Sequence, residues 1–173
     1  MNNLILYINT FLNNNKIKSQ YDYYKTNNAN EVILNLISLE SKKFGSIMEK
    51  MILEIFNFDK RINSQHDAIF QNLKIEIKCA RYWNHTNDCK WQHIEKTYDY
   101  DLLLLILIDF QEIKIWSISK NKLFSFENIN NKIINKQGNQ GYWITKNKIL
   151  NQLYLINSKN DLINFIHQIN NNE

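Results

Sequence analysis

Hydrophobic and polar residues alternate most regularly over residues 73–79. Leu, Ile, Ile and Cys alternate there with Lys, Glu and Lys, which is the period-two pattern of a strand with one buried face. Gln71 and Asn72 come just before this strand and favour a two-residue turn, because asparagine tolerates a positive φ angle. The pattern therefore predicts a β-hairpin over about residues 66–79.

The register of this hairpin sets two carboxylates opposite each other. With a two-residue turn, Phe70 pairs with Leu73, and Asp67 pairs with Glu76. Like charges across a strand pair repel, and a hard divalent cation such as Mg²⁺ would hold them together. Lys78 shares their face, and the spacing Asp-x8-Glu-x-Lys predicts metal-dependent phosphodiester hydrolysis in which the lysine positions or deprotonates the attacking water. A solvated strand face with ordinary charges would show the same pattern.

The rest of the chain contains helical and strand patterns in a mixed order. Residues 102–108 form the longest apolar run, which predicts a central strand buried on both faces. In a long helical pattern Gly45 is expected to break the helix or to pack tightly against a neighbour, whereas residues 17–25 and 80–100 have no clear period. Helices are predicted over 2–12, about 30–56, 119–126 and 159–169, and strands over 101–108, 112–118 and, at a sheet edge, 142–145. This order predicts an α/β or α+β fold with a central mixed sheet flanked by helices.

Length and composition restrict the class of protein. With 173 residues, 44% hydrophobic and 13% aromatic, the chain fits one globular domain. The net charge of +4 is compatible with a polyanionic partner without requiring one. The longest apolar run is too short to cross a bilayer, and the amino terminus lacks the basic segment of a signal peptide. With two cysteines, these features predict a cytoplasmic protein without a membrane partner or a disulfide framework.

The segments around the hairpin extend the motif. A helical segment that contains Glu49 precedes the hairpin, and the long apolar strand follows it. Over roughly residues 40–118 the chain resembles the PD-(D/E)xK nuclease superfamily, and most closely its small type II restriction endonucleases. Asp67 matches the first acidic residue of that motif, Glu76 the second and Lys78 the lysine.

The resemblance carries expectations for the fold, the site and the partners. It implies a restriction-endonuclease-like core within a single nuclease domain of residues 1–173, in which 119–173 complete the sheet and supply a DNA-recognition segment and a terminal helix. Glu49 matches an extra glutamate that the preceding helix often places near the metal. His66 stands where the family usually has a proline, a position that is often substituted. The expected enzyme uses Mg²⁺ and cuts a palindromic site in double-stranded DNA as a homodimer.

Basic and aromatic residues are interleaved after the hairpin. Arg81 and Lys90 could contact phosphates, although tryptophans that pack beneath a loop would produce the same pattern. The resemblance places Gln92 and His93 facing the DNA or the active site, whereas an isolated histidine is more often a satisfied polar group. A second basic segment, which could read bases through Asn and Gln side chains, contains Lys136, Lys146, Lys148 and residues 138–141.

Other interpretations of these residues stay open. A repair or recombination nuclease, such as a mismatch-nicking or junction-resolving enzyme, would share the motif. A non-catalytic DNA-binding domain fits the complete Asp-Glu-Lys set less well, and the chain length also suits a small subunit that pairs with a larger one. Cys79, His85, Cys89 and His93 suggest a zinc knuckle, but their spacing matches no common zinc pattern.

Overall fold

A mixed β-sheet organises the computed structural model, which describes residues 2–14, 19–83, 86–128 and 133–171. In sheet order its strands are β1 (Asp59–Lys60), β2 (Ala68–Phe70), β3 (Leu73–Arg81), β5 (Leu102–Ile108), β6 (Ile113–Ser119) and β9 (Tyr154–Leu155). β3 and β5 are parallel, whereas the other neighbouring pairs are antiparallel. The prediction of a central mixed sheet is confirmed.

The centre of the sheet is β5, as the long apolar run predicts. Every residue of β5 is buried. Each fully buried Leu or Ile side chain stabilises a fold by roughly 1.5–3 kcal/mol, so this run fixes where the core lies. β6 pairs with β5 along its whole length, which confirms the strand predicted over 112–118.

The β2–β3 hairpin has the expected turn and register. Gln71 and Asn72 have φ angles of 49° and 66°, as a tight turn of this hand requires. Phe70 pairs with Leu73, and the ladder continues to Ala68 opposite Ile75. The regular pairing ends there, because the N–H of Asp67, the residue before β2, also donates to the Ile75 carbonyl oxygen. Contrary to the prediction, Asp67 therefore does not continue the ladder to a position directly opposite Glu76.

The helices are α1 (Asn2–Asn14), α2 (Gln20–Thr26), α3 (Glu31–Ile37), α4 (Ser41–Phe56), α5 (Lys120–Ser125), α6 (Lys146–Ile149) and α7 (Lys159–Asn170), with the 3-10 turns η1 (Phe126–Asn128) and η2 (Leu150–Gln152). α1, α5 and α7 confirm the helices predicted over 2–12, 119–126 and 159–169. α2 was not predicted, because only Tyr23 and Tyr24 give it a buried side. Its start is set by Ser19, whose side chain accepts the Asp22 N–H.

The single helix predicted over about 30–56 is wrong. α3 ends at Ile37 and α4 begins at Ser41. Gly45 lies inside α4, and an added Cβ there would meet nothing within 4 Å, so this glycine neither breaks the helix nor allows close packing. The chain instead turns where the Arg81 guanidinium binds the carbonyl oxygens of Ile37 and Leu39. That contact comes from a distant strand, so local periodicity could not reveal it.

A second, smaller sheet comes partly from the unassigned segment 80–100. Its strands are β4 (Lys90–Ile94), β8 (Tyr142–Thr145) and β7 (Ile134–Lys136), in that order. β8 is therefore the middle strand, and its prediction as an edge strand is wrong because β4 could not be foreseen as its neighbour. Gly141 allows the two to meet, since a Cβ there would lie 2.6 Å from the Ile94 carbonyl oxygen.

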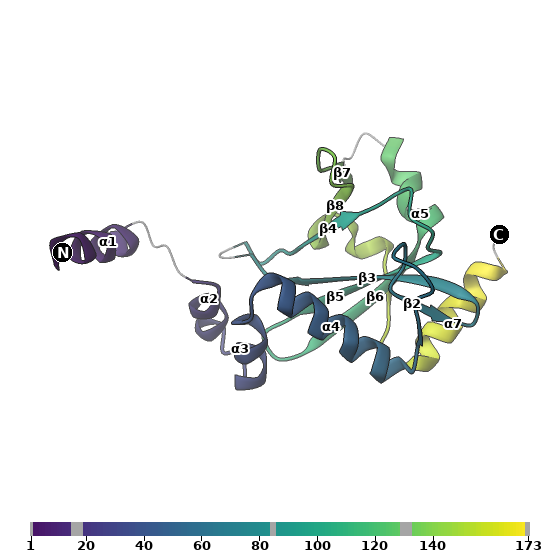
Figure 1. Cartoon of the computed structure of the whole chain (residues 1–173), viewed down its shortest axis with the longest axis horizontal. Coiled ribbons are helices and arrows are strands. Elements are labelled where there is room, and N and C mark those ends of the chain that lie inside the picture. Colours follow the sequence, from purple (N-terminus) through teal and green to yellow (C-terminus); the bar gives the residue numbers. More distant parts are fainter. Residues whose placement is uncertain (1, 15–18, 84–85, 129–132, 172–173) are drawn as a thin grey trace.

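Helix α4 and the second sheet lie on opposite sides of the central sheet. In Figure 1, α4 runs below β3, whereas β4, β8, β7 and α5 lie above it. β3 is consequently covered on both sides at its middle, and its polar residues are not on a solvated face. Among the helices of the described ranges, none has the length and apolar character needed to cross a membrane.

Candidate active site

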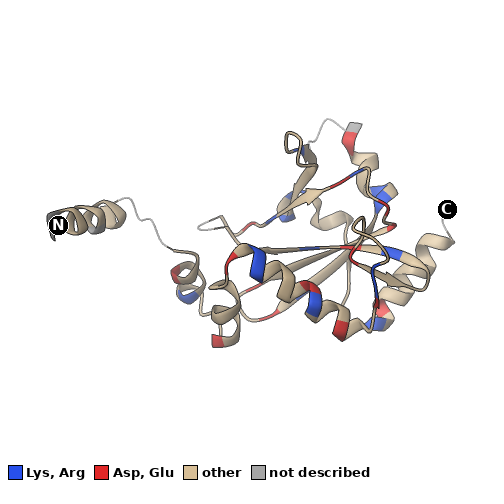
Figure 2. Ribbon diagram, viewed as in Figure 1, with Lys and Arg blue, Asp and Glu red and all other residues tan. Residues whose placement is uncertain are grey.

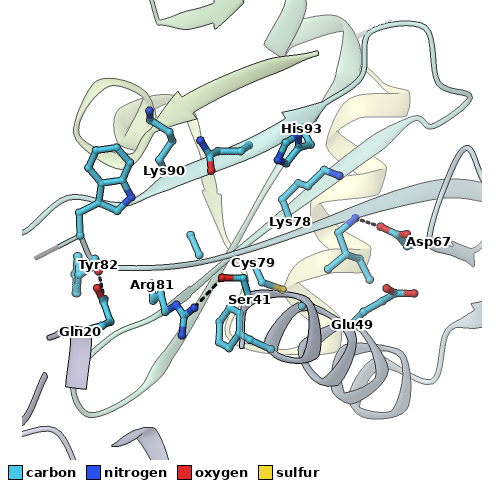
Figure 3. A pocket seen from close by; sticks show the side chains of 16 residues that line it. Gln20, Ser41, Glu49, Asp67, Lys78, Cys79, Arg81, Tyr82, Lys90 and His93 are labelled. Carbon is cyan, nitrogen blue, oxygen red and sulfur yellow. Dashed lines mark hydrogen bonds between the residues drawn. The ribbon is translucent and has the colours of Figure 1, made fainter. Parts of the chain in front are cut away.

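A cavity of about 530 Å³ opens beside β3, between α4 and β4 (Figure 3). Its lining includes Glu49 from α4, Asp67 from the start of the hairpin and Lys78 from β3. Gln92 and His93 of β4 also line it. Predicted site residues that are far apart in the sequence thus line one cavity, whereas Glu76 is not part of its lining.

Asp67 lies one residue before β2, where the hairpin opens. Its backbone N–H donates to the Ile75 carbonyl oxygen at 2.8 Å, and its Oδ2 accepts the Ile77 N–H at 2.8 Å. The side chain therefore takes the place of a backbone carbonyl in the ladder with β3 (Figure 3). This bond fixes the carboxylate at the mouth of the hairpin, where 17% of the side chain remains exposed.

Glu76 and Lys78 form an ion pair next to Asp67. Lys78 Nζ lies 2.6 Å from Glu76 Oε1, so the two side chains share one face of β3. Glu76 is only 5% exposed. Burial raises its pKa to about 7, the Lys78 charge opposes that rise, and the Asp67 charge adds to it. The predicted convergence of Asp67, Glu76 and Lys78 is present, on a face that is buried.

Glu49 reaches the same region from the other side of β3. In Figure 3 it rises from α4 below the strand, whereas Lys78 lies above it and Asp67 lies near the hairpin mouth. Burial raises the pKa of Glu49, the Asp67 charge raises it further, and the charges of Arg61 and Lys78 lower it. Glu49 therefore lines the same cavity as Asp67 and lies close enough for the two charges to influence each other. It projects from the helix that precedes the hairpin, as predicted.

Arg61 belongs to this group although the sequence analysis did not single it out. Its Nη1 lies 4.0 Å from Asp67 Oδ1. The loop that carries it is tied back by His66, which is 1% exposed and whose Nε2 accepts the Ile62 N–H at 3.4 Å. His66 therefore has a structural role here. Only the loop's return to the hairpin identifies Arg61, and no sequence spacing signals it.

A β-bulge turns Gln92 and His93 toward the cavity. The pairing of β4 with β8 shifts register between Trp91 and Ile94, and His93 has a φ angle of 56°. Bulges re-aim side chains near functional sites, and a non-glycine residue with this φ angle is strained. Four of the other five such positions in the described residues are asparagines, which tolerate this conformation. His93 is thus an unusual choice for its backbone in this chain.

Arg81 is already engaged within the protein, and its contacts there do not favour its predicted role in phosphate binding. Besides the carbonyls of the α3–α4 turn, its Nη2 donates to Ser41 Oγ at 3.2 Å, and its guanidinium lies 4.9 Å from the centre of the Phe44 ring. These contacts use the flat guanidinium on both its edge and its face. Arg81 lines the cavity as a structural tie between β3 and α4.

Lys90 lies between two indole rings at the outer end of the cavity. Its Nζ is 4.5 Å from the centre of the Trp83 ring and 3.9 Å from that of Trp143. Trp83 is 51% exposed, whereas Trp91 is fully buried and its Nε1 donates to the Ile106 carbonyl oxygen at 2.9 Å. Trp91 is therefore packed in the core, whereas a nucleic-acid contact stays a prediction for exposed Trp83.

The second basic segment forms the β7–β8 hairpin and the start of α6. Lys136 and Lys148 are exposed. Lys146 is engaged: its Nζ lies 3.1 Å from the Tyr82 hydroxyl and 3.3 Å from the Asn87 carbonyl oxygen. The base-reading role predicted for the Asn and Gln side chains of this segment stays a prediction. Lys136 and Lys148 are free to reach a phosphate, whereas the contacts of Lys146 within the protein do not favour this.

The zinc hypothesis finds no support in the two thiols. Burial, and after it the charges of Asp67 and Glu49, raises the pKa of Cys79 to about 12. Burial also raises the pKa of Cys89, which is 1% exposed. Zinc binds thiolates, so both groups are poorly suited as ligands. His85, the second member of the proposed knuckle, lies outside the described residues.

Asp67 and Glu76 have the donor chemistry that a hard divalent cation needs. Across the described ranges, no three His, Cys, Asp or Glu side chains gather closely enough to form a complete metal site. Mg²⁺ commonly takes one or two protein carboxylates and completes its shell with waters and substrate phosphates. A cation here would also relieve the unfavourable ionisation of buried Glu76. The two carboxylates therefore fit Mg²⁺ bound together with a phosphate substrate.

Comparisons of the chain with protein-family models, with curated proteins and with solved structures find no match. The residues and the geometry of the cavity are therefore what indicate a function.

Proposed function

We propose that this protein is a Mg²⁺-dependent endonuclease of the type II restriction class, built on a restriction-endonuclease-like core. It would hydrolyse phosphodiester bonds of double-stranded DNA at a short specific sequence. The observation that carries the proposal is that Asp67 and Lys78 line one cavity and that both contact buried Glu76, with Lys78 Nζ 2.6 Å from Glu76 Oε1. Buried acidic groups with a raised pKa beside a lysine, in a cleft, are typical of catalytic sites.

The residues divide into those that hold a cation and those that handle charge and protons. Asp67 and Glu76 would hold Mg²⁺, which when bound withdraws charge from the scissile phosphate and favours ionisation of the attacking water. Lys78 would direct its ammonium protons at that water or at a phosphate oxygen and so stabilise the negative charge that develops. Glu49, on the α4 side, would accept a hydrogen bond from water.

The β4 wall would bind the nucleic acid. Lys90, Gln92 and His93 face the cavity across from the hairpin. Lysine contributes a phosphate contact, whereas Gln and His can contact phosphates or base edges. With Arg81 used inside the protein, we assign the phosphate contacts to Lys90 and to the exposed Lys136 and Lys148. A homodimer would present two such walls to a palindromic site.

The direct test incubates the protein and Mg²⁺ with phage DNA of known sequence and separates the products on a gel. Discrete fragments with 5′-phosphate ends support the proposal. Asp67→Asn should leave the DNA intact, and Asp59→Asn is the matched control, because Asp59 is an exposed aspartate of β1, the neighbour of β2 in the sheet. Both variants lose one negative charge, so a difference between them isolates the site.

Other outcomes of this gel would replace the proposal. Nicking, a smear or cutting of branched DNA alone would indicate a repair or recombination nuclease. A shifted DNA band without cutting would indicate a binding domain. Cutting of one strand that appears only when a second polypeptide is added would indicate one subunit of a heterodimer.

A further inference from the structure

α1 exposes the largest apolar surface among the described helices. Leu4, Ile5, Ile8 and Leu12 are 64%, 61%, 46% and 36% exposed. Leu4, Ile8 and Leu12 follow one another at a spacing of four, and Ile5 lies beside them, so the four form one stripe along the helix. The opposite side carries Thr10, Asn13 and Asn14 together with Leu6. We call the four apolar residues Leu4, Ile5, Ile8 and Leu12 the α1 stripe.

This stripe is left open in a helix that cannot be stable by itself. A helix of 13 residues is marginal in water unless its apolar side is packed. Figure 1 shows α1 extending away from the sheet, and the four side chains of the α1 stripe remain at least 36% exposed. A further apolar surface packed on this stripe would therefore stabilise the helix.

The absence of charge in α1 restricts the partner. No Lys, Arg, Asp or Glu occurs in residues 2–14, and the described ribbon of α1 is tan throughout Figure 2. Helices that lie on membranes carry Lys or Arg on their polar side and are drawn to anionic lipids, and a polyanion needs the same charges. An uncharged stripe instead suits an apolar protein surface.

The chain carries such a surface on its own body. A groove of about 600 Å³ lies between the end of α4 and the β6–β9 edge of the sheet. Ile55, Leu150 and Leu155 line it and are 62%, 39% and 46% exposed. Glu112, Lys114 and Lys159 also line it, which gives an apolar floor with charged residues around it, the usual arrangement of an interface.

We propose that the α1 stripe of one copy packs into the groove of a second copy, and that a twofold axis repeats this contact in the opposite direction. A single helix contributes too few residues for a stable dimer, whereas reciprocal exchange doubles the area and leaves neither apolar surface open. An amphipathic helix in an apolar groove is a common mode of recognition. This inference does not depend on the proposed nuclease activity.

The test measures the mass of the full-length protein in solution by light scattering, without DNA or metal. The wild-type chain should have twice its mass of 20.9 kDa. Ile8→Glu in the stripe and Ile55→Glu in the groove should each give a monomer, because a buried unpaired carboxylate weakens association by about 100-fold or more. Circular dichroism verifies that each variant is folded.

Two matched variants separate the contact from a general effect of added charge. Leu6→Glu changes the opposite side of α1, and Ile62→Glu changes an isoleucine that is 78% exposed outside the groove; both should remain dimeric. A monomeric wild-type protein would overturn the proposal, as would wild-type binding to anionic vesicles as a monomer. A dimer that survives Ile55→Glu would overturn the assignment of the groove.

Discussion

The hairpin wall of the cavity and the α1 helix distribute polarity in opposite ways. At the hairpin, Glu76 is 5% exposed, and its charge is balanced by Lys78 within the same fold. At α1, Leu4 and Ile5 are more than half exposed, and no charge lies between residues 2 and 14. One region buries charge and the other exposes apolar surface, so each departs from the usual rule for its side chains.

The difference shows which kind of partner would stabilise each region. Buried Glu76 is ionised only at a cost, and a cation would remove that cost. The exposed stripe of α1 is solvated only at a cost, and an apolar partner would remove it. The buried charge of Glu76 therefore favours an ionic ligand, whereas the exposed α1 stripe favours an apolar protein surface. Substitutions in each region should consequently fail in different assays, and the following predictions test that separation.

The largest effect is expected from Asp67→Asn. The change keeps the shape and the hydrogen bond from the Ile77 N–H but removes the charge that would hold the cation, so cleavage should fall by roughly 10³-fold or more. Specific DNA binding in Ca²⁺, measured by gel shift, should stay within a few-fold of wild type, and so should the solution mass. A variant that cuts at the normal rate would remove Asp67 from the site.

Lys78→Met should lower the rate of the chemical step by roughly 10²-fold, the usual scale for one charge-stabilising group. Single-turnover cleavage of saturated DNA isolates this step from binding. Lys74→Met is the control, because Lys74 shares the strand face but pairs with Asp99 at 2.5 Å, away from the cavity. Equal rates in both variants would reduce the motif to two acidic residues.

Glu76→Gln should stabilise the metal-free protein at pH 8 by roughly 2–3 kcal/mol. The folded-state pKa of Glu76 is raised from 4.5 to about 7, so its contribution to stability is complete below pH 4.5 and is lost as the pH rises to about 7. The gain from Gln should therefore vanish at pH 4 in urea unfolding. Adding Mg²⁺ should raise the melting temperature of wild type but not of Glu76→Gln, and the opposite order would refute cation binding here.

The smallest effect is expected at the bulge of β4. His93→Gly should relieve the positive φ angle and raise stability by about 1 kcal/mol, while His93→Asn keeps a side chain that tolerates this backbone. If His93 contacts DNA, both variants should weaken DNA binding together, because both lose the imidazole. Unchanged binding in the two variants would leave His93 as a residue of the fold alone.

Much of the site could be predicted because its signals are local. Alternation over residues 73–79 and the Gln71-Asn72 turn determine the hairpin register as far as Ala68 opposite Ile75, and the next residue, Asp67, is then held near Glu76 and Lys78 by its bond with the Ile77 N–H. The apolar run of β5 likewise predicts the central strand, since few residue patterns other than a strand buried on both faces contain seven such residues in succession. These features follow from side-chain period and turn chemistry, which the sequence contains in full.

Other features depend on contacts between distant residues, and only the tertiary structure decided them. It placed Arg61 beside Asp67 through a loop tied by His66, bound Arg81 to the α3–α4 turn, and made β8 a middle strand by pairing it with β4. Each outcome depends on groups more than a few residues apart, for which the sequence has no period. The burial of Glu76 has the same origin. The sequence supplies the glutamate, but the packing of distant elements around β3 determines how far its carboxylate lies from water.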